Sequence, residues 1–533
     1  MCGFIFLNNV SGGGPSYHNL PNVINDLTHR GPDDKQVICE ASNYDYYFYR
    51  LAIMDPSLSG RQPFKRNKKR LMCNGEVYNF KSLRKFLQTQ GYQFVGNSDC
   101  EVLIPLFEMV GIESMVKMLD AEFAFVLVDE QQDEIFAARD PFGIRPMFYG
   151  FSHESNRICF ASEAKGLIKC CHGIKPFPPG HYYAFGAFHQ YHDIGDVSVM
   201  IESSVEEITT QIHQKLVAAV IKRLEADAPI GYLLSGGLDS SLVCAIAARV
   251  SDVPIQTFAI GMESDPIDLK YAREVAEALG TTHTEVLMSK DDVLSALRDV
   301  IYHLETWDIT TIRASIGMYL VAKHVHAHTN LKVLLTGEVS DELFGYKYTD
   351  FAPDAASFQK EAAKRVREIY MYDVLRADRM LAAHSLEARV PFADLDFAGY
   401  VMSINPVRKL NTYGKGKYLL RKAFEKADLL PEHILLREKA AFSDAVGHSM
   451  VDYLKEYAEN LYSDEAFSEA ICKYPEQTPF TKESLLYREI FEEFYPKYSG
   501  WIKDFWMPNK EWVGADINDP SARVLSNYGD SGK

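Results

Sequence analysis

Residues 230–241 read IGYLLSGGLDSS, and this stretch decides the fold of the larger part of the chain. The apolar run at 230–234 predicts a buried strand, and LVCAIAARV at 242–250 predicts a helix directly after it. Between them lies the glycine-rich turn SGGLDSS, at 235–241. Glycines let backbone N–H groups approach phosphate oxygens, and a helix N-terminus favours negative charge. The stretch therefore predicts a phosphate-binding loop rather than a plain glycine turn that opens a helix.

An acid, Asp239, stands in this loop where a loop that transfers a terminal phosphoryl group would carry a lysine. A carboxylate suits a magnesium ion bound to pyrophosphate, which leaves the α-phosphorus of a nucleotide open to attack. The loop therefore predicts a reaction of the AMP-transfer class.

The order of strand and helix repeats beyond the loop. Strand-like and helix-like segments alternate in PIQTFAIG (254–261), DLKYAREVAEALG (268–280), HTEVLM (283–288) and KVLLTGE (332–338). This alternation predicts a doubly wound parallel sheet that binds ligands at the carboxyl ends of its strands. After residue 355 the pattern is mostly helical, so helices are added to this sheet.

The first part of the chain has a different pattern. Short stretches alternate apolar and polar residues, as in YYFYRLAIM (46–54), RLMCNGEVY (70–78) and EFAFVLVD (122–129). These predict antiparallel sheet, with helices at 81–90 and 100–117 and with Ser98 or Asp99 as the cap of the second helix. We expect a first, antiparallel domain at 1–190, a linker at 191–205, a second, parallel-sheet domain at 206–512 and a mobile, polar tail at 513–533.

Composition limits the class of protein. The chain has 533 residues, 47% hydrophobic residues and a formal net charge of −17, which is typical of a soluble globular protein and argues against a nucleic-acid partner. No apolar stretch reaches the length of a membrane-spanning helix, and the N-terminus lacks a basic leader. Nine cysteines, an odd number without CxxC spacing, favour a reducing compartment, so we predict a cytoplasmic location. The basic run at 65–70 is interpreted as a hairpin tip.

Several motifs together resemble the glutamine-dependent asparagine synthetase family, whose nucleotide loop is of the ATP pyrophosphatase type. Besides MCG at the N-terminus and SGGLDSS, they are HRGPDD (29–34), RLAIMD (50–55), NGEVYN (74–79), SDCEVL (98–103), RDPFGIRP (139–146), ASEAKGL (161–167), ETWDITTIRAS (305–315), GEVSDELFGY (337–346), SLEARVPF (385–392) and KAAFSDAVG (439–447). The resemblance implies a two-domain α/β enzyme. Its first domain is an αββα sandwich of antiparallel sheets of the N-terminal-nucleophile type, and its second is the doubly wound sheet.

The resemblance also implies the roles of the first domain's residues. With Met1 removed, Cys2 carries both a thiol nucleophile and a free α-amine, whose ordinary pKa of about 7.7–8.0 suits a general base. Asn74 and Gly75 would stabilise the oxyanion formed on the glutamine amide. Arg50 would bind the carboxylate of glutamine, and Glu76 and Asp99 its ammonium. Taken singly, Arg50 also fits a strand face, Glu76 a turn and Asp99 a helix cap.

In the second domain, the resemblance implies binding of ATP, Mg²⁺ and aspartate. The expected ATP-binding residues are Leu233, Ser235, Gly236, Gly237, Asp239, Ser240, Ile260, Thr336 and Gly337. Asp239 and Asp341 would hold the metal. Glu338 and Lys439 are expected to be catalytic, and Arg313, Glu342 and Arg389 are expected to bind aspartate or its adenylate. Whether Glu338 or Glu342 removes a proton from ammonia or faces the ammonium of aspartate stays open.

The implied reaction joins glutamine hydrolysis, through a cysteine thioester, to asparagine synthesis through β-aspartyl-AMP, with release of glutamate, AMP and pyrophosphate. The resemblance to the family also implies a homodimer. One loop departs from the family pattern, because Val339 replaces a glycine and a single Gly345 replaces a pair. A β-branched residue forced to positive φ there would cost about 1–3 kcal/mol and could reshape the aspartate pocket.

This departure keeps two alternatives open: a related synthetase that amidates another carboxylate, and a non-catalytic sensor of glutamine or ATP. The SGGLDSS loop argues against a third, a glutaminase that feeds a phosphoribosyl acceptor.

Overall fold

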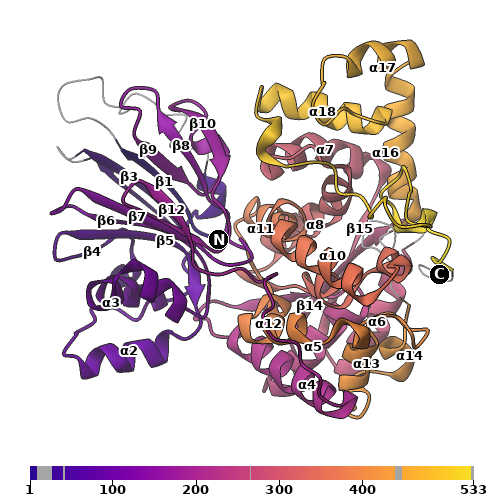
Figure 1. Ribbon diagram of the computed structural model, residues 1–533, viewed down its shortest axis with the longest axis horizontal. Helices are drawn as coiled ribbons and strands as arrows, with labels where there is room; N and C mark the ends of the chain where they lie inside the picture. The colour runs from indigo at the N-terminus through magenta and orange to yellow at the C-terminus, as the bar shows by residue number, and fades with distance from the viewer. Residues whose placement is uncertain (9–26, 40–42, 265, 439–446, 530–533) are drawn as a thin grey trace. The chain divides into compact units, whose positions relative to one another are not determined.

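The computed structural model describes residues 1–8, 27–39, 43–264, 266–438 and 447–529. Contacts between residues divide the chain into two compact units. Unit 1 comprises Met1–Asp193, Glu225–Pro229 and Leu381–Ala388, and unit 2 comprises Ile194–Leu224, Ile230–Met380 and Arg389–Lys533. Figure 1 shows that sheet dominates the first and helices surround the sheet of the second.

Two six-stranded sheets build unit 1, in the orders β10-β8-β9-β1-β3-β2 and β12-β11-β7-β6-β5-β4. All neighbouring strands in both sheets are antiparallel, as the alternating sequence pattern predicts. The strands are β1 (Gly3–Asn8), β2 (Asp34–Cys39), β3 (Tyr44–Arg50), β4 (Phe64–Arg66), β5 (Lys69–Val77), β6 (Ala121–Asp129), β7 (Glu134–Arg139), β8 (Phe148–Ser152), β9 (Ile158–Ala161), β10 (Cys171–Pro176), β11 (His181–Ala184) and β12 (Ala187–Gln190).

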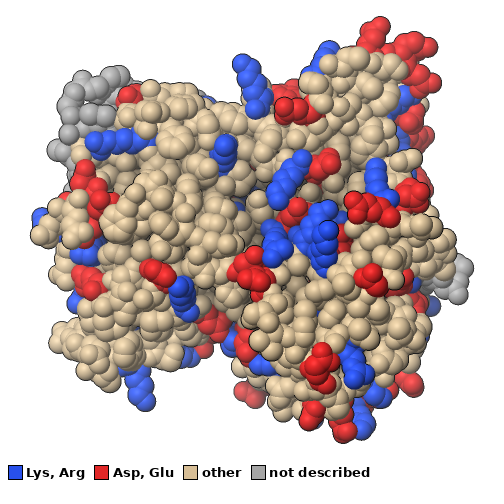
Figure 2. Space-filling view, in the orientation of Figure 1, with Lys and Arg blue, Asp and Glu red and all other residues tan. Residues whose placement is uncertain are grey.

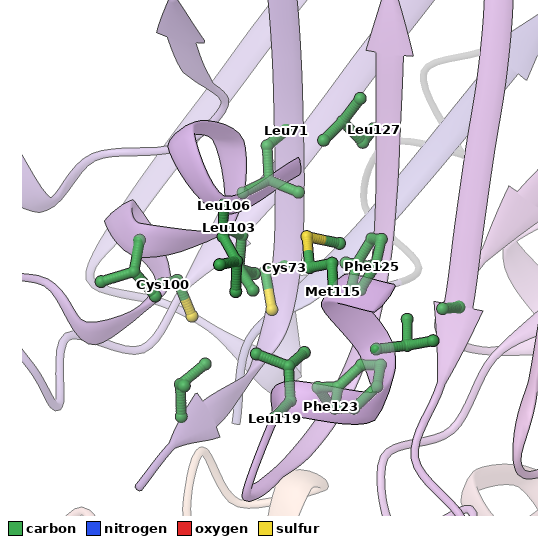
Figure 3. Close-up of a cluster of buried hydrophobic side chains, with 14 of the residues drawn as sticks. Leu71, Cys73, Cys100, Leu103, Leu106, Met115, Leu119, Phe123, Phe125 and Leu127 are labelled. Atoms are coloured by element: carbon green, nitrogen blue, oxygen red, sulfur yellow. The ribbon is translucent and has the colours of Figure 1, made fainter. Parts of the chain in front are cut away.

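The two sheets pack face to face through buried aromatic and aliphatic side chains such as Phe6, Phe48 and Val126. Helices α2 (Phe80–Thr89) and α3 (Leu103–Met118) cover the other face of the second sheet. Figure 3 shows side chains of α3 packed against those of β5 and β6. The antiparallel sandwich and both predicted helices are confirmed, and the described residues supply one helical layer of the expected αββα order.

The basic run at 65–70 lies within the β4–β5 hairpin, in which Arg66 pairs with Lys69. Asn67 and Lys68 form its tip with φ values of 46° and 65°. The predicted hairpin tip is therefore confirmed.

A third sheet has five strands in the order β15-β14-β13-β16-β17, of which β13 to β16 belong to unit 2. Its strands are β13 (Ile230–Leu233), β14 (Gln256–Met262), β15 (Thr282–Met288), β16 (Val333–Leu335) and β17 (Glu387–Arg389). Strand β13 lies parallel to both β14 and β16, and β14 lies parallel to β15. The predicted doubly wound parallel arrangement is therefore confirmed, with β13 and its loop at the centre of the sheet.

Helices surround this sheet, and α6 and α8 both pack against β14. The ends of several helices follow from local sequence: Ser204 caps α4 in a capping box with Glu207, and Gly280 ends α6 at a φ of 65°. The helices are α4 (Val205–Lys222), α5 (Leu238–Val250), α6 (Ile267–Leu279), α7 (Lys290–Leu304), α8 (Ile309–His328), α9 (Ser340–Phe344), α10 (Ala355–Glu368), α11 (Asp373–Ala382), α12 (Leu395–Ser403), α13 (Tyr418–Phe424), α14 (Glu432–Leu435), α16 (His448–Leu461), α17 (Asp464–Ile471) and α18 (Lys482–Phe494).

The described part of the C-terminal tail does not match the prediction of a mobile segment. Ala515, Ala522 and Leu525 are buried in a cluster with Tyr348 and Trp512. The prediction was wrong for this part because a polar, turn-rich sequence conceals a few apolar residues that reach one cluster. Among the residues described, none of the helices has the length and apolar character needed to cross a membrane.

Candidate functional site

Cys2 lies directly before β1, at one end of the first sheet. Its Sγ donates to the carbonyl of Leu51 at 3.6 Å, and Nε of Arg30 donates to the Cys2 carbonyl at 2.8 Å. Burial raises the pKa of the Cys2 thiol to about 11, and Glu387 and Glu76 add to the shift by their negative charge. With Met1 in place the thiol is therefore a weak nucleophile, since the thiolate is the reactive form.

Asn74 and Gly75 lie next to one another on β5. The Asn74 side chain is 0% exposed, and neither its Nδ2 nor its Oδ1 has a hydrogen-bond partner among the described residues. Buried amides are normally paired, so such an amide is one that a ligand can complete. A Cβ at Gly75 would lie 2.4 Å from the carbonyl oxygen of Glu122, so only glycine fits. This arrangement suits a donor pair for an oxyanion.

Asp99 does not cap the helix that follows it, which corrects the prediction. Neither it nor Ser98 makes a capping bond to α3 or to the 3-10 turn Asp99–Val102 before it. The Oδ2 of Asp99 accepts instead from the backbone N–H of Val77, at 2.7 Å, at the end of β5. Cys100 Sγ lies 3.6 Å from the same Oδ2 and donates to the carbonyl of Gly75 at 3.5 Å. Asp99 is thereby fixed beside the strand that carries Asn74 and Gly75.

Arg50 ends β3, and its guanidinium points into the turn that follows. Nη1 donates to the carbonyl of Ser57 at 3.0 Å, and Nη2 donates to the carbonyls of Met54 and Asp55. The turn orients the arginine, and its predicted contact with the carboxylate of glutamine stays a prediction.

In unit 2, a cavity of about 150 Å³ opens beside the phosphate loop. Eight of the nine residues predicted to bind ATP line it: Leu233, Ser235, Gly237, Asp239, Ser240, Ile260, Thr336 and Gly337. Gly236 lies behind the loop at a φ of +70°, where a Cβ would be 2.5 Å from the backbone of α6. The cavity also has an apolar side, with Phe258, Met318 and Val321. A flat base and a charged phosphate chain suit such a divided lining.

The loop is held by its own hydroxyls. Ser235 Oγ lies 3.0 Å from Ser240 Oγ and accepts from the N–H of Gly237 at 3.3 Å. Helix α5 then begins without a side-chain cap at Gly237. The N-terminus of α5 therefore meets the cavity with its first-turn N–H groups available to an anion.

The two acids predicted to hold a metal converge on a cation that the chain itself supplies. Nζ of Lys417 lies 2.8 Å and 2.7 Å from the two carboxylate oxygens of Asp239, and 2.7 Å from Oδ1 of Asp341. Ser340 Oγ donates to Asp239 at 2.7 Å. Two carboxylates that share one cation form a donor set that fits Mg²⁺. Within the described residues, neither this site nor any other gathers three or more His, Cys, Asp or Glu side chains that could hold a metal.

A second cavity, of about 120 Å³, shares four residues with the first: Asp341, Glu342, Asp373 and Arg376. Arg376 pairs with Asp373 at 2.7 Å and with Glu338 at 3.5 Å. Burial, together with the charges of Asp373 and Asp341, raises the pKa of Glu342 well above its ordinary value. The shared wall therefore carries both signs of charge, as a zwitterionic ligand requires.

Sequence reasoning missed Lys417, Asp373 and Arg376. The two charges of α11 stand three residues apart, a spacing that places them on one helix face. Lys417, in GKGKYLLR at 414–421, lies 178 residues from Asp239 and carries no local pattern that indicates its partner.

Two predicted cations lie elsewhere. Arg313 is buried against Glu483 and Asp519 and does not line either cavity, which corrects the prediction that it contacts aspartate. Arg389 is fully buried, donates to the carbonyl of Arg223 at 2.9 Å and lines neither cavity. The carboxylates of Glu483 and Asp519, rather than a ligand, take the guanidinium of Arg313, and the role predicted for Arg389 stays a prediction. Lys439 lies outside the described residues.

Val339, the departure from the family pattern, has a φ of 79° and a ψ of −21°. It is 1% exposed and lines the first cavity directly before α9. The left-handed backbone is one that β-branched residues rarely adopt, because the side chain crowds the carbonyl. The strain therefore sits at the candidate site.

These two sites define the class: a two-domain α/β enzyme in which a cysteine amidotransferase unit is joined to a nucleotide-binding synthetase unit. The family model described as "Glutamine amidotransferase domain" matches residues 1–191, and the one described as "Asparagine synthase" matches 211–360 and 350–516. The chain belongs to the glutamine-hydrolysing asparagine synthetase family.

Similar relatives span nearly the whole chain. An asparagine synthetase [glutamine-hydrolyzing] of Cricetulus griseus is 40% identical over 547 residues, which cover 95% of this chain and 96% of that protein. The Homo sapiens enzyme of the same description is 40% identical over 542 residues, which cover 94% and 95%, and the Gallus gallus enzyme 40% over 544 residues, with the same coverage.

Proposed function

We propose that this chain makes asparagine from aspartate in the cytoplasm, with ATP and Mg²⁺, and takes the nitrogen from glutamine. ATP activates the β-carboxylate of aspartate as an adenylate with release of pyrophosphate. Ammonia then displaces AMP to give asparagine. The observation that carries the proposal is the wall shared by the two cavities, because it joins a phosphate loop to a site with both signs of charge.

In the amidotransferase unit, we assign the nucleophile to Cys2. The Cys2 α-amine, free once Met1 is removed, takes the thiol proton as Sγ attacks the side-chain amide carbon of glutamine, and it gives that proton to the nitrogen as the C–N bond breaks and ammonia leaves. Water then hydrolyses the thioester to glutamate. Asn74 and the N–H of Gly75 stabilise the oxyanion in both steps. Glu76 and Asp99 face the ammonium of glutamine, and Arg50 its carboxylate.

In the synthetase unit, the loop at 235–240 and the N-terminus of α5 hold the phosphates. Mg²⁺, when bound, supplies charge neutralisation on pyrophosphate, and Asp239 and Asp341 are the residues that would hold it. Arg376 faces a carboxylate of aspartate, and Glu342 and Asp373 its ammonium. Glu338 is the candidate base for the attacking ammonia. It lines the first cavity, and its Oε1 lies 3.5 Å from Nη2 of Arg376.

The test leaves glutamine out. Purified protein receives ATP, Mg²⁺ and ammonium, with and without aspartate, and pyrophosphate, AMP and asparagine are measured. The proposal requires pyrophosphate release that depends on aspartate. Pyrophosphate release with another carboxylate instead would favour a related synthetase. The strained Val339 in the cavity wall is the reason to test this alternative. No release with any carboxylate, despite ATP binding, would favour a sensor.

A homodimer is part of this proposal, on the resemblance to the family alone. Light scattering of the purified protein tests it directly: a mass near 120 kDa, twice the chain mass of 60.4 kDa, supports the dimer, and a mass near 60 kDa rejects it.

A further inference from the structure

The C-terminal tail forms one wall of the second cavity. Pro520, Ser521 and Ala522 line it together with residues of α9 and α10. Ser521 and Ala522 are only 5% and 2% exposed. The tail therefore belongs to the surroundings of whatever occupies this cavity.

An ion pair anchors this wall at its first residue. Nη1 of Arg313 donates to Oδ1 of Asp519 at 3.0 Å, and Nζ of Lys455 lies 2.6 Å from Oδ2. Arg313 is itself 3% exposed and is held on its other side by Glu483, at 2.8 Å and 2.5 Å. A buried guanidinium that is fixed by one carboxylate presents its remaining N–H groups in a set direction. Arg313 thus positions Asp519.

The charge of Asp519 is secured by this arrangement. Burial alone would raise its pKa, but Arg313 and then Lys455 outweigh burial and hold the pKa of Asp519 well below its ordinary value. Its Oδ1 also accepts from the N–H of Ser521 at 2.8 Å, which closes a tight turn at the wall.

Apolar contacts anchor the wall at its other end. Ala522, Leu525 and Tyr528 pack in the cluster that contains Tyr348 and Trp512. Tyr348 also lines the second cavity, so the cluster and the cavity share a side chain. The segment that lines the cavity is therefore held at both of its ends.

We propose that residues 519–522 are a positioning segment of the aspartate cavity, fastened by the Arg313–Asp519 ion pair, which sets the affinity for the amino-acid substrate and keeps water from its adenylate. The inference rests on the proposed function of this cavity. Its physical basis is the exclusion of water, which strengthens charge interactions inside a site and prevents hydrolysis of a reactive intermediate. It also assigns Arg313 a role that does not require contact with substrate.

The primary test is Asp519→Asn, which keeps the shape of the side chain and removes its charge. We expect KM for aspartate to rise about tenfold, KM for ATP to stay within about twofold, and pyrophosphate release to exceed asparagine formation because water reaches the adenylate. The ratio of pyrophosphate to asparagine is the readout that a merely structural role would leave near one.

Asp452→Asn is the matched control. Asp452 forms a separate ion pair with the tail, at 2.5 Å from Arg523, and its side chain is 60% exposed and does not line the second cavity. Loss of an exposed pair should leave both KM values and the product ratio unchanged.

Ala522→Val supplies a second variant that leaves the ion pair intact and adds two methyl groups to the wall. We expect KM for aspartate to rise severalfold while KM for ATP and the product ratio stay as in the unaltered protein. Unchanged KM for aspartate in both variants overturns the inference. If Asp519→Asn does not fold, Ala522→Val decides. Failure of the unaltered protein to release pyrophosphate with aspartate would overturn the proposed function itself. This result is distinct from an unchanged KM for aspartate in the two variants.

Discussion

The Nζ of Lys417 lies 2.7 Å from Oδ2 of Asp239, so the acid of the phosphate loop is paired across the cavity with a lysine from the start of α13. A cation that bridges Asp239 and Asp341 occupies the place where a metal would act on the same carboxylates. The free enzyme therefore keeps two acids close together without the repulsion that two unpaired carboxylates would impose.

Replacement of that lysine should make the acids dependent on metal. Lys417→Met leaves both carboxylates without their internal cation, so we expect a loss of about 1–3 kcal/mol in the free energy of unfolding. Added Mg²⁺ should raise Tm more in this variant than in the unaltered protein, because the ion now has no competitor. Equal Mg²⁺ responses in thermal unfolding of the two proteins would contradict this. Lys415→Met, at a lysine that pairs with Glu438 at 3.0 Å, is the control.

The left-handed backbone at residue 339, with a φ of 79°, should make a glycine variant more stable than an alanine variant, the reverse of the usual order. In ordinary helical positions alanine is more stable than glycine by about 1 kcal/mol, but positive φ favours glycine. We therefore expect Val339→Gly to have a higher Tm than Val339→Ala. At Val321, a buried residue inside α8, the alanine variant should instead have a higher Tm than the glycine variant. The same order at both positions would show that the backbone at 339 is unstrained.

The unpartnered amide of Asn74 should matter for glutamine turnover and little for stability. Asn74→Ala removes no protein hydrogen bond among the described residues, while loss of an oxyanion donor typically lowers kcat by about 10²–10³. Activity with ammonium should be unchanged. Asn79→Ala should behave in the opposite way, because Asn79 Nδ2 donates to Met118 and its Oδ1 accepts from Asp120. Glutaminase kinetics and thermal unfolding of both variants decide the matter.

Glu342 should make stability fall as pH rises. Its folded pKa is raised above the ordinary value of 4.5, so its favourable contribution is complete below pH 4.5 and is lost as pH increases toward the folded value. A glutamine at this position does not titrate. The Tm of Glu342→Gln minus the Tm of the unaltered protein, both measured without substrates, should therefore increase from pH 5 to pH 8. A difference that is constant over this range would refute the raised pKa.

The N-terminal amine should be as important as the thiol of Cys2. An alanine inserted between Met1 and Cys2 keeps the thiol but leaves its nitrogen in a peptide bond after processing, so the proposed base is lost. We expect glutamine hydrolysis to disappear while activity with ammonium remains, as in Cys2→Ala. Mass spectrometry verifies the N-terminus. Hydrolysis by the extended protein would mean that another group takes the proton.

Much of the fold could be predicted from sequence because its determinants are local. Strand β13, the glycine loop and α5 follow one another within about twenty residues, and apolar runs and glycines specify each. The alternation of short amphipathic strands likewise predicted the antiparallel sheets. The lining of the first cavity followed, since loop residues at the carboxyl ends of parallel strands face the same edge.

The predictions that failed concern partners distant in sequence. Arg313 meets Glu483 and Asp519, which lie 170 and 206 residues further along, and no spacing in the sequence indicates such pairs. Asp99 had the position of a helix cap, but the backbone of β5 takes its carboxylate. The tail was judged by average polarity, whereas a few apolar side chains determine its packing.

The most direct test of the account follows the nitrogen. The purified protein is given glutamine labelled with ¹⁵N at the side-chain amide, together with aspartate, ATP and Mg²⁺, and asparagine is analysed by mass spectrometry. The account predicts ¹⁵N in the asparagine side chain, with glutamate, AMP and pyrophosphate formed in equal amounts. Glutamate and ammonia formed without labelled asparagine, AMP or pyrophosphate would contradict it.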